Sequence, residues 1–289
     1  MTAIRRAAAL CVATLLLAAC TVVRPPAEEL AIAEAEIDAG STARGVRRME
    51  RAFDALGVTD PARWDRLGDL AERADRDVSR RAFDRAESLL WPDATPRSTV
   101  RLTPPFTGRW IVTQGNRGEF SHLRLADRFS WDFQCIDGQG DASEARDGLP
   151  GFGAPILAPA DGVVERAQDG VPDNLDGRRN RVRAAGNVVV LRHGPNEMTH
   201  FCHLQCGSVT VRVGDQVRRG DMIGRCGCSG NAIEPHLHFA LRSGRTSDDS
   251  SIPARFEGVR ITRRGVAVPG ADGVPRTGDV VEVGESSER

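Results

Sequence analysis

The sequence predicts a mainly β domain preceded by a small α-helical segment, and two observations support this. Of the 30 Gly, 26 lie after Arg97, where short β-branched and apolar runs are broken by Gly, Pro and Asp. Before that point, apolar residues recur at helical spacing instead. We therefore expect a helical spacer over residues 21–96, a β domain over residues 97–260, and a C-terminal strand and polar tail over residues 261–289.

Charge and composition exclude several classes of protein. The 289 residues include 39 Lys+Arg and 40 Asp+Glu, which gives a formal net charge of −1 and argues against nucleic-acid binding, because phosphate binding needs a basic excess. All basic residues are Arg, and the chain has no Tyr. A Lys Schiff base and a Tyr acid are therefore excluded as catalytic groups.

The first 20 residues have the layout of an export signal. Arg5 and Arg6 precede an apolar run over residues 7–19 that is too short to span a bilayer comfortably. The run ends at Cys20 and resembles a bacterial lipoprotein signal, in which the Cys is acylated and becomes the mature N-terminus. A cleaved signal with an incidental Cys is the alternative. We expect an exported cell-envelope lipoprotein, held to the membrane by lipidated Cys20, in the outer membrane or periplasm if the cell is Gram-negative.

Four helices are expected after the signal. An Ala/Glu-rich stretch over residues 27–39 is followed by Ser41, which can cap a second helix. Asp60 and Pro61 form an N-cap and first-turn pair for a third, and residues 77–91 carry one apolar stripe for a fourth. We interpret this region as a spacer or small bundle, with a dedicated partner-binding module as the alternative.

The region beyond Val100 is expected to hold short strands joined by turns and two long loops. The loops cover residues 136–153 and 168–183, and loops of such length are often functional. The strands are expected at residues 110–113, 154–158, 162–166, 187–192, 209–213, 236–241, 265–268 and 279–283.

Histidines cluster in the second half of the chain. Five of the six lie between residues 193 and 238. His236 and His238 alternate with apolar residues, so on a strand both point to the same face. Two adjacent imidazoles in a core would each need a buried partner, which favours metal binding or catalysis over a structural role. Of His200 and His203, which face opposite sides of a strand, we expect only one at the site, and His193 is expected to be structural.

Asp132 lies in a second alternating segment, residues 129–133, among three aromatic residues. A lone carboxylate in such a setting is costly to bury, and coordination to a cation would offset that cost. A hydrogen bond to backbone or an ion pair with Arg is the alternative.

These segments together resemble the M23 zinc metallopeptidase family, also called LytM or lysostaphin-type peptidases. The resemblance implies a LytM-type antiparallel β-sheet or sandwich domain. The matching segments, in the family's order, are residues 153–164, 186–190, 201–204, 213–220, 227–231 and 235–239.

The resemblance also implies roles for individual residues. His122, Asp132 and His238 match the ligands of one Zn²⁺ per chain, while His203 and His236 match the two catalytic histidines that do not bind the metal.

Two positions depart from the commonest family pattern. Ten residues separate His122 from Asp132, where four are usual, so Asp127 is a weaker competitor for the ligand position. Phe201 stands where the family often has Tyr, so a hydroxyl role there is absent.

The implied activity is hydrolysis of peptide bonds in the stems or cross-links of peptidoglycan. Three protein ligands leave a fourth position for water, which is typical of a catalytic zinc. No Glu adjoins a metal-binding His, so His203 or His236 is the expected general base, and the sequence does not say which. The alternative is a non-catalytic LytM-like module that activates a cell-wall amidase or scaffolds division. A third hypothesis is the same hydrolysis with a competitor's cell wall or a protein as the substrate.

Five of the seven Cys belong to the exported β domain, where thiols usually oxidise. We expect a disulfide between the Cys202–Cys206 and Cys226–Cys228 segments, with a four-Cys zinc site as the alternative.

Overall fold

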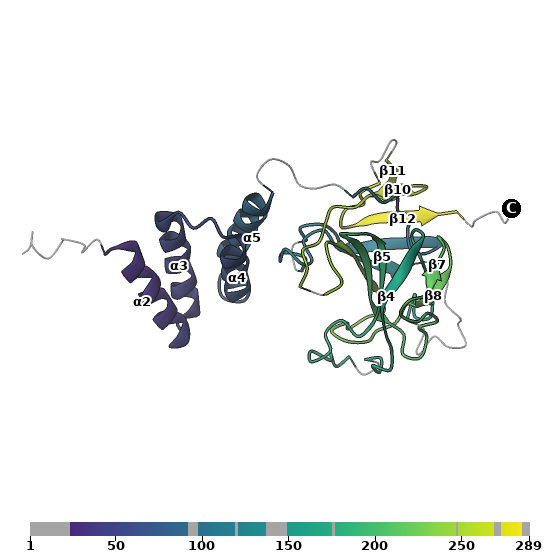
Figure 1. Cartoon of the computed structure of the whole chain (residues 1–289), viewed down its shortest axis with the longest axis horizontal. Helices are drawn as coiled ribbons and strands as arrows, with labels where there is room; N and C mark the ends of the chain where they lie inside the picture. The colour runs from purple at the N-terminus through teal and green to yellow at the C-terminus, as the bar shows by residue number, and fades with distance from the viewer. Residues whose placement is uncertain are drawn as a thin grey trace, which may run out of the picture. The chain divides into compact units, whose positions relative to one another are not determined.

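In the part of the chain that the computed structural model describes, four helices precede a set of antiparallel strands (Figure 1). The structure describes residues 24–91, 98–118, 121–136, 149–174, 177–246, 248–268 and 273–284. The predicted signal and Cys20 lie outside these residues. No helix within the described ranges has the length and apolar character needed to cross a membrane. The chain divides into two units, residues 1–82 and 83–289, with the boundary inside the last helix.

The predicted helices are confirmed, and their ends have the expected causes. The Asp60 carboxylate accepts a hydrogen bond from the Ala62 N–H at the start of the third helix, where Pro61 occupies the first turn. Gly57 ends the second helix in the left-handed conformation. The helices are α2 (Pro26–Asp38), α3 (Thr42–Leu56), α4 (Pro61–Ala71) and α5 (Arg76–Leu90).

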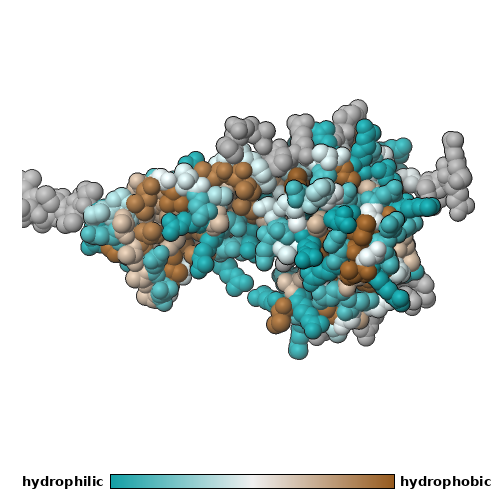
Figure 2. Space-filling view, viewed as in Figure 1, coloured by the Kyte–Doolittle hydropathy of each residue, from teal (hydrophilic) through white to brown (hydrophobic). Residues whose placement is uncertain are grey.

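The N-terminal unit has a small core of its own. Phe53 of α3 and Trp64 of α4 are buried and pack edge to face, with ring centroids 5.3 Å apart. On the outside, Arg48 forms ion pairs with Glu29 and Glu36 of α2. Apolar and polar side chains alternate over the surface of this unit (Figure 2). The packing between helices relies mainly on α3 and α4, whereas α2 buries only Ala33.

The C-terminal unit is built on a ten-stranded antiparallel sheet with a separate two-stranded sheet. The order across the large sheet is β11-β10-β12-β1-β2-β9-β6-β5-β4-β7, and β3 pairs with β8. The strands are β1 (Gly108–Gln114), β2 (Trp131–Cys135), β3 (Pro155–Leu157), β4 (Gly162–Gln168), β5 (Asn187–Gly194), β6 (Glu197–Leu204), β7 (Gln216–Val217), β8 (Met222–Arg225), β9 (Leu237–Arg242), β10 (Arg260–Arg263), β11 (Val266–Ala267) and β12 (Asp279–Val283).

The predicted mainly β fold class is thus confirmed, and alternation along the central strands separates its two faces. Trp131 of β2, Phe201 of β6 and Phe239 of β9 are fully buried in the main core. Ile156 of β3 and Ile223 of β8 belong to the same apolar cluster, so the small sheet covers this face of the large one. Residues between these aromatics in sequence point to the opposite face.

The prediction of a strand at residues 209–213 is wrong. The Thr210 N–H of this segment donates to the Ile223 carbonyl, but the segment forms no strand. Val209 and Val211 pack against the main core, which explains the strand-like apolar pattern without strand pairing. Near the C-terminus, β12 pairs with β1 and thereby joins the large sheet next to the strands at its centre.

The C-terminal part of α5 is tied to the segment between β1 and β2. Glu87 pairs with Arg117 and with Arg128, and Arg128 also pairs with Asp84. The Arg128 side chain is only 2% exposed, and its Nη1 donates to the Leu123 carbonyl at 3.0 Å. Because a buried guanidinium is costly unless it is fully paired, this ion cluster holds the β1–β2 segment in one conformation.

Replacement of Glu87 by Gln should therefore destabilise the C-terminal unit by about 3 kcal/mol, because it leaves Arg128 partly unpaired in the interior. Although burial raises the pKa of Glu87, Arg117 and Arg128 lower it below its usual value. Its contribution is thus present above about pH 4.5 and is lost as the pH falls through the lowered pKa. Urea unfolding followed by tryptophan fluorescence at several pH values measures both effects.

Glu282→Gln is the matched control, since Glu282 pairs with Arg260 in an ion pair whose side chains are 39% and 70% exposed. That change should cost less than about 1 kcal/mol. Equal losses for the two variants would contradict the role given to the buried cluster.

Candidate metal centre

Two of the predicted ligands lie side by side on the sheet. Asp132 of β2 is directly opposite His238 of β9 in the strand register, and Cys202 of β6 is the next residue in the same row. Because their neighbours Trp131 and Phe239 fill the core, Asp132 and His238 project from the other face of the sheet. The alternation that the sequence predicts is therefore what brings the carboxylate and the imidazole together.

His122 reaches the same place from the segment between β1 and β2. Its backbone adopts the left-handed conformation with φ of 60°, which is uncommon for a residue with a side chain. Nδ1 lies 3.1 Å from the Gly115 carbonyl, which can only accept, so the ring proton is on Nδ1. Nε2 is then a bare acceptor, and it is buried with no hydrogen-bond partner.

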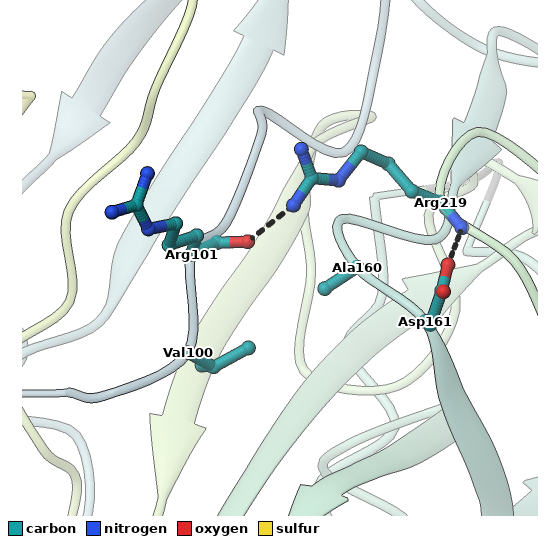
Figure 3. Close-up of a pocket in the computed structure, with 5 residues that line it drawn as sticks. All are labelled: Val100, Arg101, Ala160, Asp161 and Arg219. Carbon is teal, nitrogen blue, oxygen red and sulfur yellow. Dashed lines mark hydrogen bonds between the residues drawn. The ribbon is translucent and has the colours of Figure 1, made fainter.

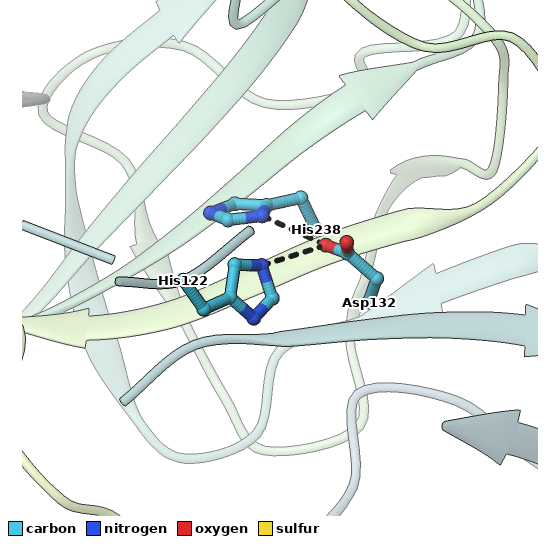
Figure 4. Close-up of side chains that lie close together, drawn as sticks. All are labelled: His122, Asp132 and His238. Carbon is cyan, nitrogen blue, oxygen red and sulfur yellow. Dashed lines mark hydrogen bonds and ion pairs between the residues drawn. The ribbon is translucent and has the colours of Figure 1, made fainter. Parts of the chain in front are cut away.

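The three side chains converge on one oxygen. Asp132 Oδ1 lies 2.8 Å from His238 Nδ1 and 3.3 Å from His122 Nε2, as Figure 4 shows. One ligand atom from each residue lies within 4.8 Å of the other two. A bare imidazole nitrogen facing a carboxylate oxygen is repulsive unless a cation lies between them. Two imidazoles and one carboxylate are the donor set that zinc prefers in catalytic sites, so the residues present fit the ion.

Electrostatics at this point favour a bound positive charge. Burial would raise the pKa of Asp132, but His122 and His238 lower it well below its usual value. Burial would lower the pKa of His238, but the Asp127 and Asp132 carboxylates raise it well above the ordinary value. The pocket therefore attracts either protons or a metal ion, and a metal would displace the proton from His238 Nδ1.

His203 and His236 lie next to this group. Their ring centroids are 4.8 Å apart, and the His203 ring is 6.0 Å from the His238 ring. His203 Nδ1 lies 2.8 Å from the Ser229 carbonyl, and His236 Nδ1 lies 2.9 Å from the Glu234 carbonyl. Carbonyl oxygens accept hydrogen bonds, so both rings carry their proton on Nδ1 and leave Nε2 free.

Strict alternation along β6 would turn His203 toward the core with Phe201. The structure avoids this because His203 has a φ of 63°, which redirects its side chain toward His236. Burial, together with the charges of His236 and His238, lowers the pKa of His203 to about 3. The ring is therefore neutral at physiological pH and its Nε2 can accept a proton.

The other two histidines are held by structural contacts. His200 is buried, and its Nε2 lies 2.8 Å from the Gly244 carbonyl. His193 contacts the Asp161 carbonyl through Nδ1 and the Thr199 hydroxyl through Nε2. Both ring nitrogens of His193 thus have hydrogen-bond partners. Of His200 and His203, it is His203 that faces the site.

The predicted disulfide between the Cys202–Cys206 and Cys226–Cys228 segments is absent, and all four residues are free thiols. The physical reason is that Cys202 packs on the site face of the sheet, whereas Cys226 belongs to the main core and Cys206 is exposed. Cys228 packs in a third cluster with Phe152 and Ala232. Four thiols so dispersed do not form a zinc site either.

The loop between β4 and β5 borders the site. The Ala185 carbonyl accepts from the His203 N–H, and the Asn231 N–H donates to the Ala184 carbonyl. Gly230 has a φ of 75°, and a Cβ there would lie 2.4 Å from the Ala184 carbonyl oxygen, so this close approach requires glycine. The loop is therefore fixed against the turn that carries Ser229 and the backbone of His203.

A separate surface pocket of about 470 Å³ is lined by Val100, Arg101, Ala160, Asp161 and Arg219 (Figure 3). The Arg219 guanidinium donates to the Arg101 carbonyl, and the Arg219 N–H donates to the Asp161 carboxylate. None of the histidines lines it, and its polar groups serve to join neighbouring segments.

Residues 148–250 match the model of peptidase family M23. Over these residues the chain is similar to peptidase family M23. The matched residues include His203, His236 and His238, whereas His122 and Asp132 precede them. Two of the three candidate ligands therefore precede the matched residues, and one of them, His122, lies in the segment that the ion cluster of Glu87 holds in place.

Curated relatives support the same family. The chain is 27% identical over 159 residues to the cell division protein DipM of Caulobacter vibrioides, covering 52% of this chain and 24% of that protein. It is 34% identical over 104 residues to the peptidoglycan DD-endopeptidase ShyC of Vibrio cholerae, covering 36% of this chain and 21% of that protein. The chain thus spans less than a quarter of the length of these relatives.

Among solved structures, the M23 domain is similar to the catalytic domain of the prophage-encoded M23 protein EnpA from Enterococcus faecalis. The TM-score is 0.36 at 19% sequence identity, and the match covers 53% of this chain and 94% of that domain.

Sequence patterns did not reveal three groups that touch the site residues. The Ser229 and Gly115 carbonyls set the proton positions of His203 and His122. Every residue has a backbone carbonyl, so the sequence does not indicate which one makes such a contact. Arg242 is the third: it pairs with Asp127, whose Oδ1 lies 3.3 Å from His238 Nε2. Its position four residues after His238 on one strand could have indicated that both side chains leave the same face.

Removal of a ligand should cost the site its metal. We expect the wild-type chain to bind one zinc ion. His122→Ala and Asp132→Ala should each weaken zinc binding by more than about 100-fold, because loss of a ligand costs more than loss of a residue that only contacts a ligand. Competition with a chromophoric chelator measures the affinity. His193→Gln is the control and should bind zinc like the wild type, and equal binding by all four proteins would exclude the assigned ligands.

Proposed function

We propose that the protein is a zinc-dependent endopeptidase that hydrolyses peptide bonds in peptidoglycan stems or cross-links during cell-wall remodelling. The observation that carries this proposal is the bare, buried Nε2 of His122 beside the Asp132 carboxylate and His238 Nδ1. The match of residues 148–250 to peptidase family M23 and the similarity to DD-endopeptidases support the same reaction class.

The catalytic step would use the two histidines beside the ligands. Zinc held by His122, Asp132 and His238 would supply Lewis acidity to a water and to the scissile carbonyl. His203 is neutral and offers Nε2 as a proton acceptor, and its Nδ1–H is anchored on the Ser229 carbonyl. His236 is likewise anchored through Nδ1 and presents Nε2 to the same space, 4.0 Å from Asp132 Oδ1. Either ring can accept the proton of the attacking water at Nε2, and the N–H formed there can then donate that proton to the leaving amine.

The rim of the site suits a substrate that carries carboxylates. Arg179, Arg181 and Arg183 are exposed on the β4–β5 loop, and none of the described residues forms an ion pair with them. The base of this loop is bonded to the backbone of His203. Exposed guanidinium groups attract anionic ligands, so this loop would favour a substrate that carries carboxylates.

Export and lipid attachment complete the proposal. We infer that residues 1–20 direct the chain out of the cytoplasm and that acylated Cys20 anchors it in the envelope, with the helical region between anchor and peptidase domain. The relatives' cell-wall and cell-division names agree with an exported location. Such an anchor would keep the site close to the producing cell's own wall.

A non-catalytic role is the second candidate, and the similarity to the cell division protein DipM favours it. A module of this kind would activate a cell-wall amidase or scaffold division without cutting peptides. The candidate ligands and both candidate catalytic histidines are present in this chain, which favours the enzyme.

Activity on purified sacculi separates the two candidates. We expect the zinc-loaded wild type to release peptide fragments that chromatography and mass spectrometry identify. His203→Ala and His236→Ala should each lower kcat by about 10²–10⁴-fold while zinc binding persists, because general acid–base help is lost and the ligands remain. Cys206→Ser, at an exposed thiol, is the control and should retain full activity. A wild type that binds zinc but releases no fragments would exclude the enzyme.

A further inference from the structure

We propose that Asp127, held by Arg242, is a positioning residue that fixes the metal-binding nitrogen and the ring orientation of His238. Asp127 lies in the segment between β1 and β2, five residues before Asp132. This inference rests on the proposed metal site and assigns a residue outside its three ligands.

Both ring nitrogens of His238 have a carboxylate neighbour. Nδ1 lies 2.8 Å from Asp132 Oδ1, on the ligand side, and Nε2 lies 3.3 Å from Asp127 Oδ1. When Nδ1 binds a metal, the neutral ring has its single proton on Nε2, and this N–H can donate to Asp127. A carboxylate in this outer position selects the tautomer and raises the basicity of the ligand.

Arg242 holds Asp127 from the other side. Its Nη2 donates to Asp127 Oδ1 at 2.5 Å, and the Arg242 residue is only 3% exposed. Arg242 follows His238 by four residues on β9, so both side chains leave the same face of the strand. His238, Asp127 and Arg242 thus form a chain of contacts. Strand β9 carries both His238, the candidate ligand, and Arg242, which holds Asp127 against it.

The backbone around Asp127 is fixed as well. The Asp127 N–H donates to the Arg124 carbonyl, and its carbonyl accepts from the Ser130 N–H at 2.9 Å. The next residue, Arg128, is locked by the buried ion cluster with Glu87. Asp127 therefore has little freedom to turn away from His238.

The geometry distinguishes this role from that of a ligand. The atoms that lie within 4.8 Å of one another come from His122, Asp132 and His238. The Asp127 oxygen closest to the site already has His238 and Arg242 as partners. A positioning residue should change how tightly the metal is held and leave the number of ligands unchanged.

Zinc affinity of the full chain by chelator competition, with the visible spectrum of the Co²⁺-substituted protein, tests the proposal. We expect Asp127→Ala to weaken zinc binding by about 10–100-fold, with one ion still bound and the wild-type Co²⁺ bands retained. Asp127→Asn should lose less, because its carbonyl oxygen still accepts from His238 Nε2–H. Asp279→Asn is the control, since Asp279 of β12 is a buried carboxylate that pairs with Arg263 of β10. It should lower stability and leave zinc affinity unchanged.

Two results would overturn the proposal while the metal site stands. Wild-type zinc affinity in both Asp127 variants would show that Asp127 does not position His238. A changed set of Co²⁺ bands in Asp127→Asn, with the ion still bound, would show that Asp127 is itself a ligand. If the wild type bound no zinc, the metal site would fall and this inference with it.

Discussion

The partly buried carboxylate of Asp132 is the constraint around which the C-terminal unit is arranged. It lies on a central strand whose neighbouring side chains fill the core, and its oxygen faces one nitrogen each of His122 and His238. An unpaired carboxylate in this position would be costly, and so would the bare nitrogen of His122. A single cation between these groups removes both costs. The same arrangement leaves His203 and His236 at the side with free Nε2 atoms.

Two different parts of the domain hold this arrangement. The sheet supplies Asp132 and His238 through strand register, which is rigid because the aromatic core lies directly behind it. His122 comes from a segment with a left-handed backbone and no strand pairing, so it needs support from elsewhere. The buried cluster of Arg128 and Glu87 provides that support. The end of α5 is consequently part of the peptidase domain as well as the end of the helical region.

Much of this could be predicted from residue patterns, and the exceptions have physical causes. Alternation placed Asp132, His236 and His238 on the face away from the core, because a strand has a strict period of two. His203 escaped that rule because one positive φ reverses its direction, and only the family resemblance pointed to it. The disulfide was expected because the cysteines are close in sequence to the site, but sequence distance does not reveal that Cys202 and Cys226 lie in different clusters. The pairing of Glu87 with Arg128 joins residues 41 apart, and no local pattern predicts such a contact.

The most direct test of the central claim is anomalous scattering at the zinc edge from crystals of the zinc-loaded protein. We predict one strong peak per chain, at about 2.0–2.2 Å from His122 Nε2, His238 Nδ1 and an Asp132 oxygen. A peak bound instead by cysteine thiolates, or no peak at the three side chains, would contradict the assignment of this site as the metal centre of a peptidase.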